Sequence, residues 1–230
     1  MKRALPFYSA VALAVCAIAL LGSSAGAQDA EDYKGDPYTL RVCPVSGSPL
    51  GSMGTPILLN HAGRDIRFCC AGCTPKFDAE PAKYISKIDA LMVEAQTPLY
   101  PLDTDVVNDA PLGDEPVDVV HNNRMVRFSS QMSAQKFFRA PEQYLAKLDE
   151  AVIASQIDSY PLTTCVIAGE ALDTMGEPLK IVAGNRLVQF CCAGCESKFW
   201  KNPQKALAKL DGGAAGEEEE GSDEKDHAEH

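Results

Sequence analysis

Cysteine is missing from the middle of this 230-residue chain, although it is abundant on both sides. No cysteine occurs between residues 74 and 164, whereas three crowd into RFCCAGCTPKF (67–77) and three into QFCCAGCESKF (189–199). Between them the chain reads RFSSQMSAQKF (127–137), the same frame with serine in place of each cysteine. The absence therefore marks a third copy of one repeated unit rather than an unrelated segment.

Other scarcities exclude whole classes of protein. The chain has only four histidines and one tryptophan, and it contains no glycine-rich phosphate loop and no Ser/His/Asp set of the kind that serves nucleophilic catalysis. Its formal net charge is −11, which disfavours nucleic acid as a partner because phosphates attract basic surfaces. We therefore expect neither an enzyme nor a nucleic-acid-binding protein.

The only long apolar run lies at the N-terminus. MKR precedes about fifteen apolar residues and then Ala-Gly-Ala at 25–27, which is typical of a secretory signal peptide over residues 1–27. The run is shorter than the ~20 residues that a membrane span needs. We therefore expect a secreted or periplasmic protein with no membrane span after cleavage, beginning with a linker over residues 28–37.

Acidic residues are concentrated at the opposite end of the chain. Residues 212–230 hold eight acids and one lysine, and they lack aromatic and branched apolar residues. Such a segment cannot bury enough apolar surface to offset its ordering entropy. An acidic disordered tail over 212–230 is predicted.

Three tandem repeats account for the rest of the chain. One phenylalanine per copy marks the frame at spacings of 60 and 62 residues: Phe68, Phe128 and Phe190. Each copy opens on a tyrosine and closes on a related phrase, SKID in the first copy and AKLD in the other two. These landmarks predict a first copy over 38–99, a second, degenerate copy over 100–159 and a third copy over 160–211.

Each copy is expected to fold as a β-hairpin followed by two helices, so the predicted fold class is α+β. ILLNHAGRDIRF (57–68) contains two β-prone runs around an Ala-Gly turn. Pro81 is typical of a helix start, and Tyr84, Ile88 and Leu91 recur after it at helical spacing. Because a core of about sixty residues is marginal alone, such a unit usually needs a staple.

The eight cysteines outside the signal peptide are the candidate staple in the two outer copies. Each outer copy has one cysteine before its hairpin and three after it: Cys43, Cys69, Cys70 and Cys73, then Cys165, Cys191, Cys192 and Cys195. A helix that begins at the cluster would favour thiolate over thiol. Thiolates select thiophilic ions such as Zn(II) or Cu(I), so about two ions per chain are expected.

The spacing C-x25-C-x3-C, followed by Lys-Phe, a proline and an aromatic residue, resembles the TRASH and YHS domains. These small treble-clef-like modules are associated with heavy-metal binding, trafficking and sensing. The resemblance implies a treble-clef-like fold and the following metal ligands: Cys43, Cys69 and Cys73 in the first copy, Cys165, Cys191 and Cys195 in the third. Cys70 and Cys192 are additional to the family pattern, which leaves the fourth ligand open.

The leading interpretation is an exported heavy-metal-binding protein that buffers, delivers or senses a thiophilic ion. Its expected partners are the metal ion and, for delivery, another exported protein. The alternative is a protein-interaction array stapled by zinc or by disulfides, since an even cysteine count in an exported chain is typical of disulfides and a Cys43–Cys73 bridge needs only Cα atoms within about 7 Å. A redox dithiol at Cys70-x2-Cys73 has the right spacing but not the βαβ setting.

The cysteine-free copy is expected to be a spacer that folds without metal. It keeps the apolar frame of the unit, and we expect it to share core contacts with its neighbours. Asp105 stands at the frame position of the first cysteine, where we expect a cap or turn role. His61 and His121 share one frame position and are expected to be solvated, because the third copy has Ala183 there.

Overall fold

The computed structural model describes residues 35–212. The predicted signal peptide, the first part of the predicted linker and the acidic tail beyond Gly212 lie outside the described residues. Within residues 35–212, no helix is both long and apolar enough to cross a bilayer.

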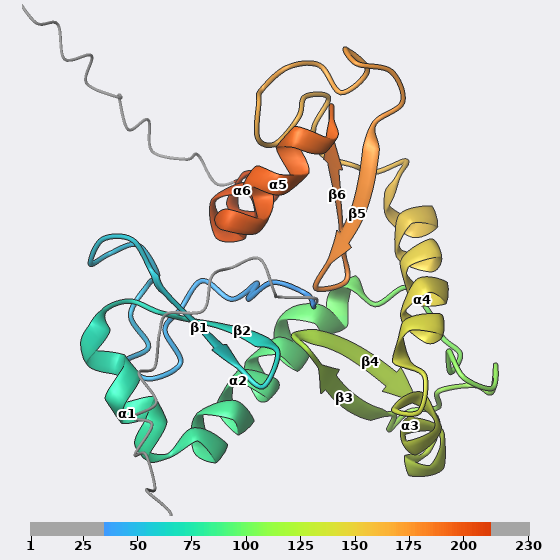
Figure 1. Cartoon of the computed structure of the whole chain (residues 1–230). Coiled ribbons are helices and arrows are strands. Elements are labelled where there is room, and N and C mark those ends of the chain that lie inside the picture. The colour runs from blue at the N-terminus through green and yellow to red at the C-terminus, as the bar shows by residue number, and fades with distance from the viewer. Residues whose placement is uncertain (1–34, 213–230) are drawn as a thin grey trace, which may run out of the picture.

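Three two-stranded antiparallel hairpins organise the chain, and helices follow each of them (Figure 1). The first copy contains β1 (Ile57–His61), β2 (Arg64–Phe68), the 3-10 turn η2 (Ala71–Cys73), α1 (Thr74–Ala79), α2 (Pro81–Gln96) and a second 3-10 turn, η3 (Thr97–Leu99). The second contains β3 (Val117–His121), β4 (Arg124–Phe128), α3 (Gln131–Phe137) and α4 (Pro141–Gln156). The third contains β5 (Leu179–Ala183), β6 (Arg186–Phe190), α5 (Ala193–Lys201) and α6 (Pro203–Leu210). The predicted mixed α+β class is confirmed.

Two-residue turns close the hairpins. Both central residues have positive φ in every turn: Ala62 (52°) and Gly63 (83°), Asn122 (46°) and Asn123 (70°), Gly184 (57°) and Asn185 (61°). Positive φ at both positions is the requirement of a type I′ turn, whose twist matches that of the strands. The glycine and asparagine residues that marked these turns in the sequence are the residues that tolerate this conformation best.

Each copy buries its own pair of phenylalanines. One ring comes from the end of the return strand and the other from the following helix, and their centroids lie 5.5, 5.3 and 5.5 Å apart: Phe68–Phe77, Phe128–Phe137 and Phe190–Phe199. All six rings are fully buried. In α2, Met92 rather than Leu91 completes the buried stripe with Ile88.

The prediction that His61 and His121 are solvated is wrong. The ring of His61 lies edge-on to Phe77 at 5.2 Å, and that of His121 lies edge-on to Phe137 at 5.4 Å. Both side chains are half-buried, and burial lowers the pKa of His121. The last position of each outgoing strand faces the helix after the cluster, so a histidine there covers the phenylalanine edge.

The phrase that closes each repeat ties the last helix to the rest of its copy. Its lysine donates to a backbone carbonyl next to the first cysteine or its counterpart: Lys87 to Pro44 (2.8 Å), Lys147 to Val106 (3.5 Å) and Lys209 to Val166 (3.0 Å). Its aspartate pairs with the first arginine of the return strand: Asp89 with Arg64, Asp149 with Arg124 and Asp211 with Arg186. The repeated phrase is therefore a clamp between helix, hairpin and loop.

A buried polar joint connects the first copy to the second. Arg64 Nε donates to Asn123 Oδ1 (2.6 Å), and Asn123 Nδ2 donates to the carbonyl of Asp65 (2.8 Å). Gln96, at the end of α2, donates to the carbonyl of Asn123 (2.7 Å) and accepts from Met125 N (2.8 Å). The turn of the second hairpin is thereby bonded to the first hairpin and to α2.

The same joint recurs between the second and third copies. Arg124 Nε donates to Asn185 Oδ1 (2.5 Å), and Asn185 Nδ2 donates to the carbonyl of Met125 (2.8 Å). Gln156, at the end of α4, donates to the carbonyl of Asn185 (2.9 Å) and accepts from Leu187 N (2.8 Å). Repetition of the joint fixes how successive copies are placed.

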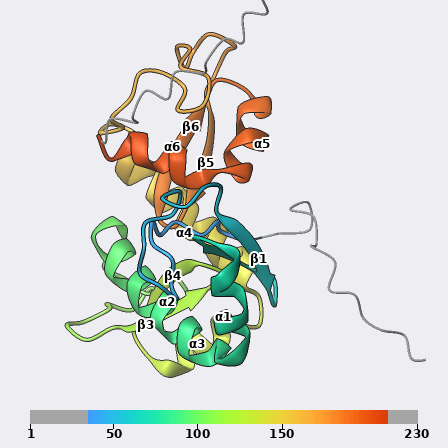
Figure 2. The ribbon, with the colours of Figure 1, turned by 90° about the vertical axis from the view of Figure 1, so that its left-hand side faces the viewer.

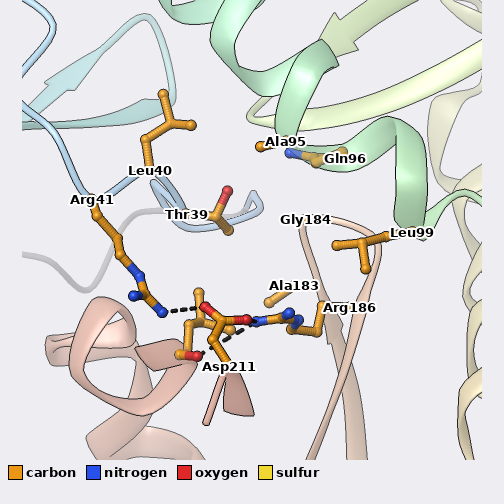
Figure 3. A pocket seen from close by; sticks show the side chains of 11 residues that line it. Thr39, Leu40, Arg41, Ala95, Gln96, Leu99, Ala183, Gly184, Arg186 and Asp211 are labelled. Carbon is orange, nitrogen blue, oxygen red and sulfur yellow. Dashed lines mark hydrogen bonds and ion pairs between the residues drawn. The ribbon is translucent and has the colours of Figure 1, made fainter. Parts of the chain in front are cut away.

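The first and third copies also meet, and the third lies across the other two (Figures 1 and 2). Asp36, near the end of the predicted linker, accepts from Gly184 N (2.7 Å) and pairs with buried Arg124 (3.0 Å). Asp211 pairs with both Arg41 and Arg186 at the edge of a pocket between the two copies (Figure 3). The end of the predicted linker is thus part of the folded body.

Candidate metal centres

A tight turn presents the first cysteine of each outer copy. Cys43 N donates to the carbonyl of Ser48 (2.9 Å), and Gly47 N donates back to the carbonyl of Cys43 (2.8 Å). Gly47 has a φ of 75°, a left-handed conformation that glycine adopts without strain. The third copy repeats this geometry with Cys165 and Gly169, whose φ is also 75°. We call these segments, 43–48 and 165–170, the knuckle turns.

The other cysteines lie where the return strand meets the next helix. Cys69 directly follows β2, and extended Cys70 (φ −159°) begins the η2 turn, whose first hydrogen bond runs from Cys73 N to the carbonyl of Cys70 (3.2 Å). In the third copy, Cys192 (φ −162°) begins α5 in the same way. The chain therefore folds back and brings the cluster against the knuckle turn.

Six of the eight cysteines form two buried triads. The Sγ atoms within each triad all lie within 4.8 Å of one another: Cys43, Cys69 and Cys73, then Cys165, Cys191 and Cys195. The Cys69–Cys73 and Cys191–Cys195 Sγ separations are both 3.8 Å. Every member is at most 7% exposed, so each triad is a sulfur-lined site inside its copy.

Cys70 and Cys192 flank the triads from more exposed positions. Cys70 Sγ is 4.0 Å from Cys69 Sγ and 3.9 Å from Cys73 Sγ, while Cys192 Sγ is 3.7 Å from Cys195 Sγ. Both side chains are half-buried. All eight cysteines within residues 35–212 are free thiols, and these Sγ–Sγ separations are nearly twice the 2.03–2.05 Å of a disulfide. The structure thus places the two extra thiols beside the triads rather than within them.

Hydrogen bonds lower the pKa of both knuckle cysteines. Burial opposes ionisation of Cys43, but hydrogen bonds from Ser46 and from the backbone outweigh it and lower the pKa to about 7. Burial likewise opposes ionisation of Cys165, and backbone hydrogen bonds around it lower its pKa to about 7. The knuckle cysteine of each triad therefore ionises near neutral pH.

The sequence predicts that the helix N-terminus favours thiolate at the cluster. The structure shows that this does not hold for every cysteine there. Burial raises the pKa of Cys73 and of Cys195 to about 12, and the neighbouring thiols add to the effect. The pKa is lowered at Cys70, first by the Cys73 side chain, and at Cys192, first by the Cys195 backbone. The cysteine that begins the helix benefits, whereas the next one does not because it is buried among other sulfurs.

The donor set fits one thiophilic ion per triad. A metal–sulfur bond of about 2.3 Å with tetrahedral angles separates neighbouring sulfurs by about 3.8 Å, and trigonal angles by about 4.0 Å. Within the triads, the Cys69–Cys73 and Cys191–Cys195 Sγ separations are both 3.8 Å, and all other pairs lie within 4.8 Å. Sulfur atoms at this spacing are placed to share an ion.

The second copy replaces the triad with hydrogen bonds. Asp105 is fully buried at the frame position of Cys43, and its carboxylate accepts from Val107 N (2.9 Å), Ser129 N (2.7 Å) and Ser129 Oγ (2.8 Å). The bond to Val107 is the predicted turn role, whereas the bonds to Ser129 reach across to the position of Cys69. Burial would raise the pKa of Asp105, but hydrogen-bonding groups of Ser133, Ser129 and Val107 lower it.

Two supporting contacts escaped the sequence reasoning. Ser46 Oγ lies 3.3 Å from Cys69 Sγ, whereas in the third copy Ala168, at the same frame position, donates its N–H to the knuckle cysteine, Cys165 Sγ (3.5 Å). The second contact comes from the lysines of the closing phrases, Lys87 and Lys209, which donate to backbone carbonyls of the knuckle turns. Repetition exposed the lysines in the sequence but not their function, while Ser46 has no counterpart in the third copy that could have marked it.

Comparison with protein-family models, with curated proteins and with solved structures finds no match to this chain.

Proposed function

We propose that this protein is an exported heavy-metal-binding protein whose two cysteine triads each hold one thiophilic ion, Zn(II) or Cu(I). The observation that carries the proposal is the convergence of three buried sulfur atoms, twice, within 4.8 Å of one another, with one pair in each triad at the 3.8 Å that a shared ion requires. Export rests on the signal-like N-terminus of the sequence.

The order of elements in the outer copies supports the resemblance to TRASH and YHS domains. A knuckle turn, a hairpin and a helix start surround each triad, an order of elements that agrees with the proposed treble-clef-like module. In each outer copy, the knuckle turn supplies one triad cysteine, and the junction between the return strand and the helix supplies the other two. These three sulfur ligands leave a fourth coordination position for Cys70, for Cys192 in the third copy, or for an exchanging ligand.

An open fourth position suits buffering or delivery better than a purely structural role. Structural zinc sites are closed by four protein ligands, whereas a site with three protein ligands can exchange its fourth. Cys70 and Cys192 are half-buried beside the triads, where an incoming donor protein or chelator can reach them. We assign the protein to buffering or delivery of its ion, with an exported protein as exchange partner in the case of delivery.

The repeated joint favours a second candidate, a stapled interaction array. Gln96 and Gln156 bond successive copies to one another, as a scaffold requires. In that case the ions would serve only to hold each outer copy closed.

Metal analysis of protein exported to a bacterial periplasm tests the proposal. We expect about two thiophilic ions per chain by elemental analysis, together with eight thiols that titrate after the ions are removed under acid. A variant with serine at all six triad positions should recover no ion. Native protein with all eight thiols oxidised and no metal would overturn the proposal in favour of a disulfide-stapled array.

A further inference from the structure

Three methionine side chains are strongly exposed among the described residues: Met53 (63%), Met132 (80%) and Met175 (72%). A single exposed apolar side chain needs no explanation by itself. Two of these three, however, occupy the same place in the repeat, and that repetition distinguishes Met53 and Met175 from Met132.

Met53 and Met175 occur only in the copies that carry cysteine. Each follows its knuckle cysteine by ten residues, within SMGTP (52–56) and TMGEP (174–178). The corresponding loop of the second copy is two residues shorter between Asp105 and β3, and it contains no methionine. The methionine has therefore disappeared from the same copy that lost its thiols.

The two methionine loops have the same built geometry. Ser52 Oγ and Thr174 Oγ1, the residues before each methionine, both donate to a backbone carbonyl three residues earlier at 2.7 Å. The glycine after each methionine, Gly54 or Gly176, has a φ of 98° or 109° and donates its N–H to the carbonyl three residues earlier. A turn that needs glycine thus holds each methionine outward.

These loops enter their hairpins at the end where the cysteines lie. Ile57 begins β1 and pairs with Phe68, the residue before Cys69. Leu179 begins β5 and pairs with Phe190, the residue before Cys191. Each exposed thioether consequently stands on a loop at the cluster end of its copy, outside a buried triad.

Thioether sulfur is a neutral, soft ligand, and it suits Cu(I). Zn(II) in proteins takes thiolate, imidazole and carboxylate ligands instead. A methionine outside a thiolate site is therefore no ligand for Zn(II), whereas it is a first ligand for incoming Cu(I).

We propose that Met53 and Met175 are outer thioether ligands that receive Cu(I) and pass it to the triad of their own copy, which rests on the proposed metal-binding function. The ion stays in its +1 state throughout. As it moves inward, its bond to the neutral thioether breaks and bonds to triad sulfurs form, and each thiol that becomes a ligand releases its proton to solvent.

Methyl-13C methionine labelling of the reduced chain from residue 28 tests this assignment. The probes are Cu(I), supplied as a weak soluble complex, and Zn(II) in a separate titration. We expect the methyl signals of Met53 and Met175 to shift with Cu(I) and to stay in place with Zn(II), while Met132, which is even more exposed but lies in the cysteine-free copy, responds to neither. Equal shifts with both metals, or no shift while copper–thiolate absorption develops, would overturn the assignment without touching the triads.

Transfer kinetics add a second readout. Met53→Leu with Met175→Leu should slow Cu(I) uptake on the order of tenfold at unchanged final stoichiometry, as expected for loss of an auxiliary ligand, whereas Met132→Leu should leave the rate unchanged. An unchanged rate in the double variant would overturn the role in uptake. If the unaltered chain developed no metal–thiolate absorption with either ion, the proposed metal-binding function itself would fail.

Discussion

The first and second copies close the same frame with different chemistry. Both bury a phenylalanine pair at nearly the same separation, 5.5 and 5.3 Å, and both anchor the knuckle turn or its counterpart through a lysine. In the second copy, one carboxylate, Asp105, bonds the turn to the start of the next helix through Ser129. A single aspartate suffices for closure, so three buried thiols in each outer copy exceed what the frame needs. The excess is a further argument that they serve to hold an ion.

The second copy also shows how neighbours share burial. Val120 of the second copy's hairpin packs against the core of the first copy, and Val182 of the third copy packs against the core of the second. Together with the joints at Gln96 and Gln156, these contacts agree with a spacer that sets the distance between two metal sites. The spacer role remains a prediction.

The largest effect is expected from removing one triad member. Cys73→Ser or Cys195→Ser should reduce the metal content from about two ions to about one. The loss should loosen only the copy that carries the change, because the apparent binding free energy of a structural thiolate–zinc site, about 10–16 kcal/mol, stabilises the copy that holds the ion. Elemental analysis and amide exchange of each copy provide the measurement. Ser133→Ala, at the matching position of the second copy, is the control and should leave both ions in place. Unchanged metal content in both cysteine variants would mean that the triads are not the sites.

A smaller but still large effect is expected at the hydrogen-bonded counterpart. Asp105→Asn removes a buried charged acceptor that takes three hydrogen bonds, and it should destabilise the second copy by about 3 kcal/mol. Denaturant unfolding combined with amide exchange over residues 100–159 would measure this loss. Metal content should stay at about two ions. Loss of an ion in this variant would contradict the independence of the three closures.

Acid should separate the two kinds of closure. The pKa of Asp105 is lowered in the folded state, so its contribution is present above the unfolded value of 3.8 and is lost as the pH falls through the lower folded value. Protons compete for the thiolates at higher pH, because the pKa of Cys43 and of Cys165 is about 7. As the pH falls, the metal should therefore be released before the amides of residues 100–159 begin to exchange. Adding a chelator should likewise remove the metal while those amides stay protected. If the second copy opened first under either treatment, the spacer model would be wrong.

A moderate effect is expected at the joints. Gln96→Leu leaves the Met125 N–H and the Asn123 carbonyl without their partner, which should cost about 2 kcal/mol, and Gln156→Leu should cost a similar amount at the next joint. Thermal unfolding measures both, with exposed Gln135→Leu on α3 as the control. If Gln96→Leu behaved like the control, the joint would contribute to placement but not to stability.

The sequence was informative where a feature is local or repeated. The hairpin turns, the helix start at Pro81 and the buried phenylalanines follow from turn chemistry and periodicity, which act within a few residues. The joint did not follow, because Arg64 and Asn123 are 59 positions apart and meet only once two copies pack together. The buried cysteines could be listed but not ranked in acidity, since the pKa depends on which thiol receives backbone hydrogen bonds and which is surrounded by sulfur.

The smallest effect is expected at the thiols beside the triads. Cys70 Sγ stands 3.9–4.0 Å from two triad sulfurs, yet it is half-buried and lies outside the triad, so we predict an auxiliary rather than an obligatory ligand. Cys70→Ser should keep about two ions per chain and weaken the first site on the order of tenfold or less, while Cys192→Ser should do the same at the third copy. Competition with a chelator measures each affinity, and the unaltered site in the same chain serves as reference. If Cys70→Ser removed its ion as completely as Cys73→Ser, the site would be a closed set of four thiolates, which is the arrangement of structural zinc and not of a site that exchanges Cu(I).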